Sequence, residues 1–196
     1  MTDFTKVRAN LERRGFQVSC FAAAQAAADY LTAKLEGKTI GYGGSMTLKQ
    51  LGLMERLEGR AALLGHWSGS THQEAAAAPI YLTSVNGLAE TGELINIDGT
   101  GNRVASTIFG HEEVYFLIGR NKLAPDYDAA LWRARNIASP KNAHRLGCKT
   151  PCAVKGDKCY DCSSPERICR ALAVLWEKPK GIGRAEVVLI DEDLGY

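Results

Sequence analysis

The sequence lacks any apolar run long enough to cross a lipid bilayer. A membrane-spanning helix needs about 20 consecutive, mostly apolar residues. Even the alanine-rich stretch that starts at Ala22 is interrupted by Gln25, Asp29 and Lys34. We therefore predict that the chain does not insert into a membrane.

Residues 1–8 also lack the apolar stretch of a secretory signal peptide. No Pro- or Ser-rich linker, block of like charge or internal repeat divides the chain. At 196 residues with 45% hydrophobic content, it can bury a full core without disulfide staples. These features predict a cytoplasmic protein with a single domain over residues 1–196.

The chain has little excess charge of either sign. Its formal net charge is +2, and no aromatic-rich surface accompanies its local groups of basic residues. Proteins that bind nucleic acid generally carry a broad basic footprint. The composition therefore argues against a nucleic-acid partner.

Helical and extended patterns alternate along the sequence, which is typical of an α/β fold. The expected helices cover residues 4–14, 22–35, 47–57 and 126–138. The expected strands cover residues 16–21, 38–42, 61–64, 80–85, 93–97, 114–118 and 186–190. The turn at residues 98–102 predicts a hairpin between the segments 94–97 and 103–106. We expect a mainly parallel sheet flanked by helices, joined by this antiparallel piece.

Five of the six cysteines lie within 22 residues. Cys159 and Cys162 form a Cys-x2-Cys pair, which lets two thiolates from one tight turn reach the same metal. Cys152 and Cys169 are each separated from this pair by six residues. They would complete a four-sulfur site for an iron–sulfur cluster or for Zn²⁺. Cys148 is then a spare thiol.

Other interpretations of the cysteine-rich segment, residues 148–169, stay open. The thiols could form reversible regulatory disulfides, or they could have no special role. Seven basic and three acidic residues lie between positions 141 and 170. Such cations would lower the cost of holding an anionic four-thiolate centre, although a solvated loop would look similar. Cys20 alternates with Phe16 and Val18 and is predicted to be a buried apolar residue.

A glycine-rich loop follows the expected strand 38–42 and precedes a helix. Gly43 and Gly44 let backbone N–H groups approach an anion closely, and Ser45 or Thr47 can add a hydroxyl or simply cap the helix. The loop has neither the lysine of a P-loop nor the spacing of a dinucleotide fingerprint. Beyond the carboxyl ends of parallel strands, such a loop is a candidate anion site.

A second polar loop, residues 84–92, lies between two apolar strands. Asn86 and Thr91 offer hydrogen bonds, and Gly87 and Gly92 permit sharp turns. Glu90 could act as a base or nucleophile if a pocket desolvated it. An exposed capping carboxylate is the alternative role.

The histidines share no metal-binding spacing, although His66 and His72 could line a cleft.

Several separated motifs resemble one known family, the LUD domain of lactate-utilization proteins. The matching segments are residues 41–47, 89–92, 119–122, 140–146 and 193–196. The resemblance implies an α/β fold shared with CoA transferases and sugar-phosphate isomerases. It implies a cleft built by the two loops described above, with Glu90 where such folds often place a reactive carboxylate, and it adds Asn121 and Lys122 as ligand-binding residues.

The cysteine spacing is similar to that of a short subgroup of the family with a Thr-Pro-Cys-x6-Cys-x2-Cys-x6-Cys pattern. The resemblance implies an iron–sulfur cluster, preferentially of four irons, on Cys152, Cys159, Cys162 and Cys169, with Zn²⁺ as the alternative. The leading hypothesis is a protein of lactate or organic-acid utilization that binds a small anionic metabolite and exchanges electrons with a redox protein. The alternatives are an acyl/CoA transferase or isomerase that uses Glu90 beside a structural metal, and a non-catalytic ligand or redox sensor.

Overall fold

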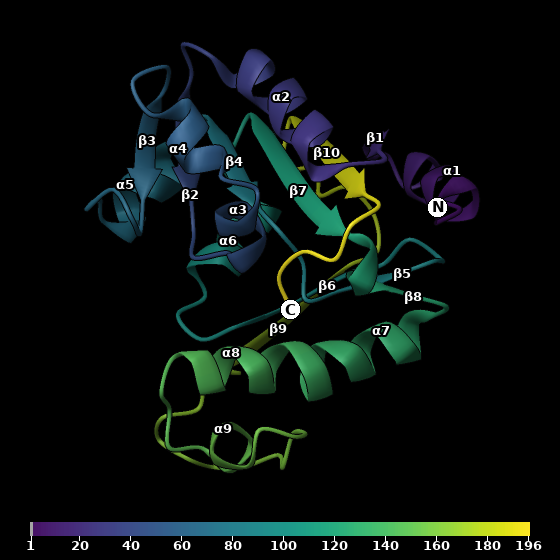
Figure 1. Ribbon diagram of the computed structural model, residues 1–196, viewed down its shortest axis with the longest axis vertical. Coiled ribbons are helices and arrows are strands. Elements are labelled where there is room, and N and C mark those ends of the chain that lie inside the picture. Colours follow the sequence, from purple (N-terminus) through teal and green to yellow (C-terminus); the bar gives the residue numbers. More distant parts are fainter. Residues whose placement is uncertain (1) are drawn as a thin grey trace.

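A six-stranded, fully parallel sheet forms the centre of the computed structural model, which describes residues 2–196 (Figure 1). Its strands, in order across the sheet, are β1 (Gln17–Phe21), β10 (Arg184–Ile190), β7 (Glu113–Gly119), β4 (Ile80–Thr83), β2 (Thr39–Tyr42) and β3 (Ala62–Gly65). In β7 and β10 every residue after the first is buried. Near-continuous apolar strands of this kind are covered on both faces of a parallel sheet.

Helices cover both faces of this sheet. On one face lie α2 (Ala24–Leu35), α3 (Met46–Gln50) and α4 (Leu53–Leu57), whose leucines pack against β2, β4, β7 and β10. The other face carries α1 (Thr5–Arg13), α5 (His72–Ala77) and α6 (Asn102–Ile108). Val7 and Leu11 of α1 meet Phe116 and Leu189 there. The α/β class predicted from the sequence is confirmed.

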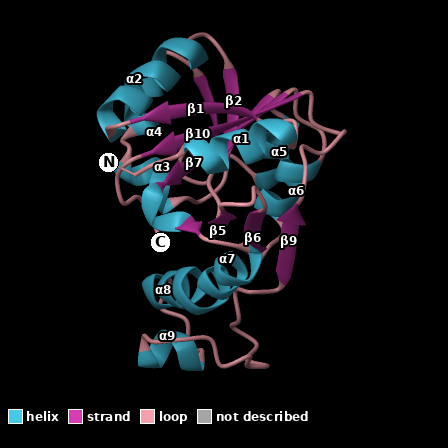
Figure 2. Cartoon of the chain, turned by 90° about the vertical axis from the view of Figure 1, so that its right-hand side faces the viewer, coloured by secondary structure: helices cyan, strands magenta, loops and turns pink. Residues whose placement is uncertain are grey.

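A second, smaller sheet lies beside the first. Its order is β8 (Leu123–Ala124), β5 (Gly87–Ala89), β6 (Leu94–Asp98) and β9 (Ala171–Leu175), and β6 runs antiparallel to both β5 and β9. A long helical segment packs against it and consists of α7 (Tyr127–Arg133), the π-turn η2 (Ala134–Ala138) and α8 (Ser139–Arg145). Figure 2 shows this segment below the small sheet, with α9 (Pro151–Lys155) further out.

The sequence-based element boundaries fail at three places. Residues 103–106 belong to α6 and not to a hairpin, because the Asp98 carboxylate accepts the N–H groups of Arg103 and Val104 and so starts a helix. The expected helix 47–57 is two helices, because Gly52 adopts a left-handed φ of 60° between them. The expected helix 126–138 continues through the π-turn to residue 145.

Cys20 is exposed and not buried as predicted. It lies on β1, which is an edge strand of the parallel sheet, so one side of the strand has no neighbouring strand to cover it.

Among the described residues, no helix is long and apolar enough to span a membrane.

Four adjacent strands bring separate parts of the chain to one edge of the sheet. Because β2, β4, β7 and β10 are parallel neighbours, their carboxyl ends lie together. The segments that follow them are residues 43–47, 84–86, 120–122 and 191–196. This edge of an open α/β sheet is where ligands commonly bind.

Candidate functional site

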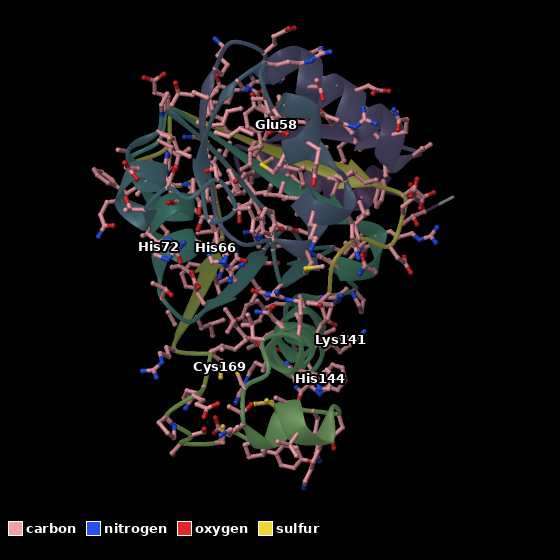
Figure 3. All side chains as sticks on the ribbon, turned by 60° about the vertical axis from the view of Figure 1, so that its left-hand side comes forward. Glu58, His66, His72, Lys141, His144 and Cys169 are labelled. Carbon is pink, nitrogen blue, oxygen red and sulfur yellow. The ribbon has the colours of Figure 1, made fainter. Side chains whose placement is uncertain are left out.

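A cavity of about 290 Å³ lies at the carboxyl ends of the strands. Residues from all four post-strand segments line it, together with residues of α6 and α8. Those that bear on its chemistry are Gly44, Ser45, Thr47, His66, His72, Ser84, Asn86, Asp98, Arg103, Lys122, Arg145, Gly195 and Tyr196. The structure therefore confirms that His66 and His72 line a cleft, and Figure 3 shows these two side chains near each other.

Lys122 is the most deeply buried cation of this cavity, with only 4% of its surface exposed. It sits on the 3-10 turn η1 (Arg120–Lys122), which directly follows β7. Its Nζ donates hydrogen bonds to Thr47 Oγ1 at 2.8 Å and to Ser84 Oγ at 2.9 Å. Burial lowers the pKa of Lys122 to about 7, and the nearby Arg133 and Arg103 add to this effect.

Arg133 holds three segments together behind the cavity. Its guanidinium donates to the backbone carbonyls of Asn121, Asn86 and Tyr196 at 2.7, 2.6 and 3.1 Å. Its pKa is lowered to about 10 by burial. Asn121 acts on the same terminal segment, since its side chain accepts the Leu194 N–H at 3.0 Å. These contacts give the cavity its shape, although Asn121 does not itself line it.

The charge of the cavity is mainly positive. Arg103, Lys122 and Arg145 line it, and the one lining carboxylate among the described residues is Asp98. Asp98 is already occupied, since it accepts backbone N–H groups at the start of α6 and lies 3.6 Å from Arg103. Within residues 2–196, no carboxylate makes an ion pair with Lys122. The arrangement favours an anionic ligand.

The glycine-rich loop contributes to the cavity in part. Ser45 Oγ accepts the Leu48 N–H at 3.4 Å and so caps α3, whereas Thr47 Oγ1 accepts from Lys122. Gly44 lines the cavity, but Gly43 does not. A Cβ at Gly43 would lie 2.5 Å from Arg103 Cγ, so this glycine is required for close packing of Arg103.

The second predicted loop, residues 84–92, also lies only partly in the cavity. Asn86 lines the cavity, and its Oδ1 accepts the Ile97 N–H at 2.7 Å. Gly87 lies outside the cavity and packs against α7, where a Cβ would lie 2.5 Å from the Ala130 carbonyl oxygen. Its role is close packing of a strand against a helix.

Glu90, Thr91 and Gly92 lie away from the cavity and face α1. The Glu90 carboxylate pairs with Lys6, and the Thr91 carbonyl accepts from Arg14 Nε at 2.9 Å. The expectation that both loops build one cleft is therefore wrong for residues 90–92. The sequence could not show this, because the partners on α1 are about 80 residues distant along the chain. A catalytic role for Glu90 stays an untested prediction.

A second cavity of about 250 Å³ contains the predicted metal-binding cysteines. Cys152, Cys159, Cys162 and Cys169 all line it, and Cys148 does not. All four are free and partly buried. The chain thus brings together the four thiols of the predicted pattern from a segment with little regular secondary structure. Figure 3 places Cys169 in the lower part of the molecule.

Hydrogen-bond donors surround these sulfur atoms. The Asp161 N–H lies 3.3 Å from Cys159 Sγ, and an Arg167 N–H lies 3.5 Å from Cys169 Sγ. Asp161 has a φ of 46°, and it is the single non-glycine residue with positive φ in the described chain. This strained turn aims the Asp161 N–H at the sulfur. Hydrogen bonding and the charge of Cys169 raise the pKa of Arg167.

The geometry of the thiols bears on which metal they could hold. Tetrahedral Zn²⁺ with Zn–S bonds of about 2.3 Å needs four sulfurs converging on one point. Within residues 2–196, no three His, Cys, Asp or Glu side chains are positioned to hold a single metal ion. In an iron–sulfur cluster, each thiolate binds a different iron, so the sulfurs surround a larger volume. The four thiols around this cavity are the side chains that could hold either group.

The two cavities share a wall. Ile97 of β6, Ser139 of α8 and Ile168 line both of them. Ser139 directly follows the π-turn η2, and its Oγ donates to the Ala134 carbonyl five residues earlier at 2.9 Å. Local π-turns are frequent at functional sites.

Sequence reasoning missed several residues of the first cavity. Ser84 follows β4 and was visible as a polar residue at a strand end. Arg103, and Arg133 behind the cavity, lie on helices without any local motif, and Arg145 lies in the segment 140–146 without being singled out there. These arginines reach the site only because particular strands and helices become neighbours in the folded chain. No periodicity in the sequence marks them as site residues.

Comparison with known proteins places the chain in a family. The sequence matches the LUD domain over residues 4–190, and the chain therefore belongs to the LUD domain family. A crystal structure of a DUF162 family protein from Deinococcus radiodurans is similar in fold, with a TM-score of 0.53 and 13% identity. The similarity covers 97% of this chain and 99% of that chain. A search of curated proteins found no match.

Proposed function

We propose that this LUD-domain protein binds a small anionic metabolite in the first cavity and an iron–sulfur cluster on Cys152, Cys159, Cys162 and Cys169. The observation that carries the proposal is the wall of Ile97, Ser139 and Ile168 that the two cavities share. A metabolite and a cluster bound on its two sides would be close enough to influence each other. Together with membership of the family, this supports a role in organic-acid utilization.

The first cavity is suited to an anion because its fixed charges are cationic and partly desolvated. Arg103 is held by Asp98 and by the Ile97 carbonyl, which accepts from its guanidinium at 2.8 Å. Lys122 is held by two hydroxyl groups. Pre-positioned cations bind a carboxylate or phosphate with little loss of side-chain freedom. Hydroxyls and amides in the lining can fix the rest of a small polar molecule.

The second cavity is suited to an anionic cluster for related reasons. Arg135, Arg167 and Arg170 line it together with the four thiols. Arg167 also donates to the Cys162 carbonyl at 2.8 Å, so its position is fixed within the cysteine-rich segment. Nearby cations and N–H···S hydrogen bonds stabilise negative charge on sulfur. When bound, such a cluster would supply one-electron transfer, and a redox protein would be the partner.

The first test is metal and sulfide analysis of protein purified without oxygen, combined with its visible spectrum. We expect iron and acid-labile sulfide, with a chromophore that bleaches on reduction. Cys159→Ser should lose most of the iron, because one of four ligands is gone. Cys148→Ser is the matched control, since Cys148 lies in the same segment but outside the cavity, and it should keep the wild-type iron content.

Two outcomes would contradict the cluster. Stoichiometric zinc would make the cysteines a structural site, and protein without metal, together with reversible disulfides between the same cysteines, would make them redox thiols. Anion binding is tested separately by titration calorimetry with lactate, pyruvate and inorganic phosphate. Absence of heat with all three, in metal-loaded protein, would count against the metabolite site.

A further inference from the structure

The hydrogen bonds of Lys122 define the direction of its free electron pair. Ser84 Oγ donates its own hydrogen to the Leu117 carbonyl at 2.5 Å, so it can only accept from Lys122. Thr47 Oγ1 also accepts from Lys122. A neutral amine has two N–H groups and one lone pair. With both N–H groups donated to these hydroxyls, the lone pair of Nζ is left without a hydrogen-bond partner.

The remaining side of the amine is kept open by a glycine. Gly195 lines the same cavity as Lys122, and its φ is 67°. A Cβ on Gly195 would lie 3.0 Å from Lys122 Nζ and 2.5 Å from Thr47 Oγ1. Any larger residue would therefore crowd the nitrogen. The space at this point admits a reacting carbon atom only because the side chain is missing.

The surroundings of Lys122 favour the neutral amine over the ammonium ion. Arg133 and Arg103 are the cations that face it, and both disfavour a further positive charge. No carboxylate among residues 2–196 forms an ion pair with it. A lysine that is desolvated beside other cations is a nucleophile near neutral pH. A structural lysine would instead be paired with an acid or reach solvent.

We propose that Lys122 is a catalytic residue that forms a Schiff base with the carbonyl group of a small anionic oxo compound, such as a 2-oxo acid. This inference rests on the proposed anion site and adds to it the reactive group and the substrate class. Arg103 and Arg145, which line the same cavity, would hold the anionic group while the carbonyl carbon meets Nζ. This reaction does not require the cluster.

The reaction balances without any further reactant. The lone pair of Nζ attacks the carbonyl carbon, a C–N bond forms and the π electrons move to oxygen, which takes one proton from the nitrogen. The resulting carbinolamine then loses its hydroxyl group together with the second proton of the nitrogen. The products are an imine and one molecule of water, and nothing is oxidised or reduced.

Borohydride trapping tests this step on the wild-type protein. The protein is incubated at pH 8 with pyruvate, 2-oxoglutarate or dihydroxyacetone phosphate and then reduced with sodium borohydride. Intact-mass measurement and peptide mapping locate the secondary amine. We expect at least one probe to modify Lys122 about tenfold more than Lys49, because burial beside two arginines gives Lys122 a substantial neutral fraction at this pH. Lactate has no carbonyl to attack and should give no adduct.

Two variants separate this inference from the anion site on which it rests. Lys122→Met removes the amine but keeps an unbranched side chain, and it should still bind the probes in calorimetry through Arg103 and Arg145 while giving no adduct. Lys49→Met, on the exposed end of α3, should behave as wild type. Probes that bind wild-type protein but never modify Lys122 would overturn the Schiff base and leave the anion site standing. If no probe binds and none is trapped, both proposals fail. Adducts that survive in Lys122→Met would also overturn the assignment.

Discussion

The body of the protein and its cysteine-rich segment are held together by different forces. In β10 six of seven residues are buried, whereas within the segment, residues 148–169, only Thr150 and Ala153 are buried. Apolar burial stabilises the body at about 25 cal/mol per Å². The segment has too little of it to be stable by itself. It is attached to the long helix by a few polar contacts, such as His144 Nδ1 with the Ala153 carbonyl at 2.8 Å.

This difference in burial indicates that a cofactor would stabilise the cysteine-rich segment more than the body. Ligands that the unfolded chain does not hold in place turn binding free energy into folding free energy. The four thiols are such ligands, and the surrounding segment has few other stabilising contacts. The first cavity is the opposite case, because it is built by residues that the parallel sheet already fixes.

The largest expected effect is removal of the cluster that we propose for the cysteine-rich segment. Chelation under reducing conditions should leave the body folded and loosen residues 148–169, because the sheet does not depend on the thiols. Hydrogen exchange and limited proteolysis, read by peptide mass, should show the change confined to this segment. Equally increased exchange in β7 and β10 would contradict the independence of the body from the thiols. A segment that stays protected after chelation would contradict its dependence on a cluster.

The second effect concerns Lys122 and the pH dependence of stability. Its pKa is about 7 in the folded protein against an ordinary value of 10.5, so between these values the unfolded chain holds a proton that the folded chain lacks. The free energy of unfolding therefore rises with pH across this interval, at about 1.4 kcal/mol per unit at most. The burial cost is fully present below pH 7 and disappears near pH 10.5.

Urea unfolding of wild type and Lys122→Met at pH 7, 8, 9 and 10 measures this effect. The variant should be more stable than wild type at pH 7, and this advantage should shrink by roughly 3 to 4 kcal/mol as the pH rises to 10. Arg103, Arg133, Asp98, His66 and His72 also face or line this cavity, but they are present in both proteins, so the difference isolates Lys122. A difference independent of pH would show that Lys122 has an ordinary pKa.

The smallest effect tests how tightly the body is packed. A Cβ on Gly41 of β2 would lie 2.0 Å from the Ala75 carbonyl oxygen of α5. Gly41→Ala should therefore destabilise the fold by about 2 kcal/mol. Gly44→Ala is the matched control from the next loop, since its nearest neighbour would be His66 Cδ2 at 4.0 Å. Equal thermal stability of the two variants would contradict the close packing of α5 on β2.

The sequence predicted most of the central elements because their patterns are local. The strands at 80–85, 114–118 and 186–190 are short apolar runs, and they correspond to β4, β7 and β10. β5 and β8 were missed because strands of three and two residues carry too few positions to show a period, and β9 because its continuous apolar run does not distinguish a strand from a helix. The hairpin predicted around residues 98–102 was wrong although these residues are typical of a turn. The Asp98 carboxylate accepts the Arg103 N–H and so starts α6 instead.

The cysteine-rich segment and the surroundings of Lys122 differ in how far the sequence alone could predict them. The spacing of Cys152, Cys159, Cys162 and Cys169 is a local property, and the sequence alone predicted that they form a group. In the structure all four line one cavity, and their binding of a metal stays a prediction. The surroundings of Lys122 depend on which strands are neighbours, and no local pattern contains that information. Its burial, its hydroxyl partners Thr47 and Ser84, and the arginines that face it were decided only by the tertiary structure, because residues 37 to 75 positions apart meet there.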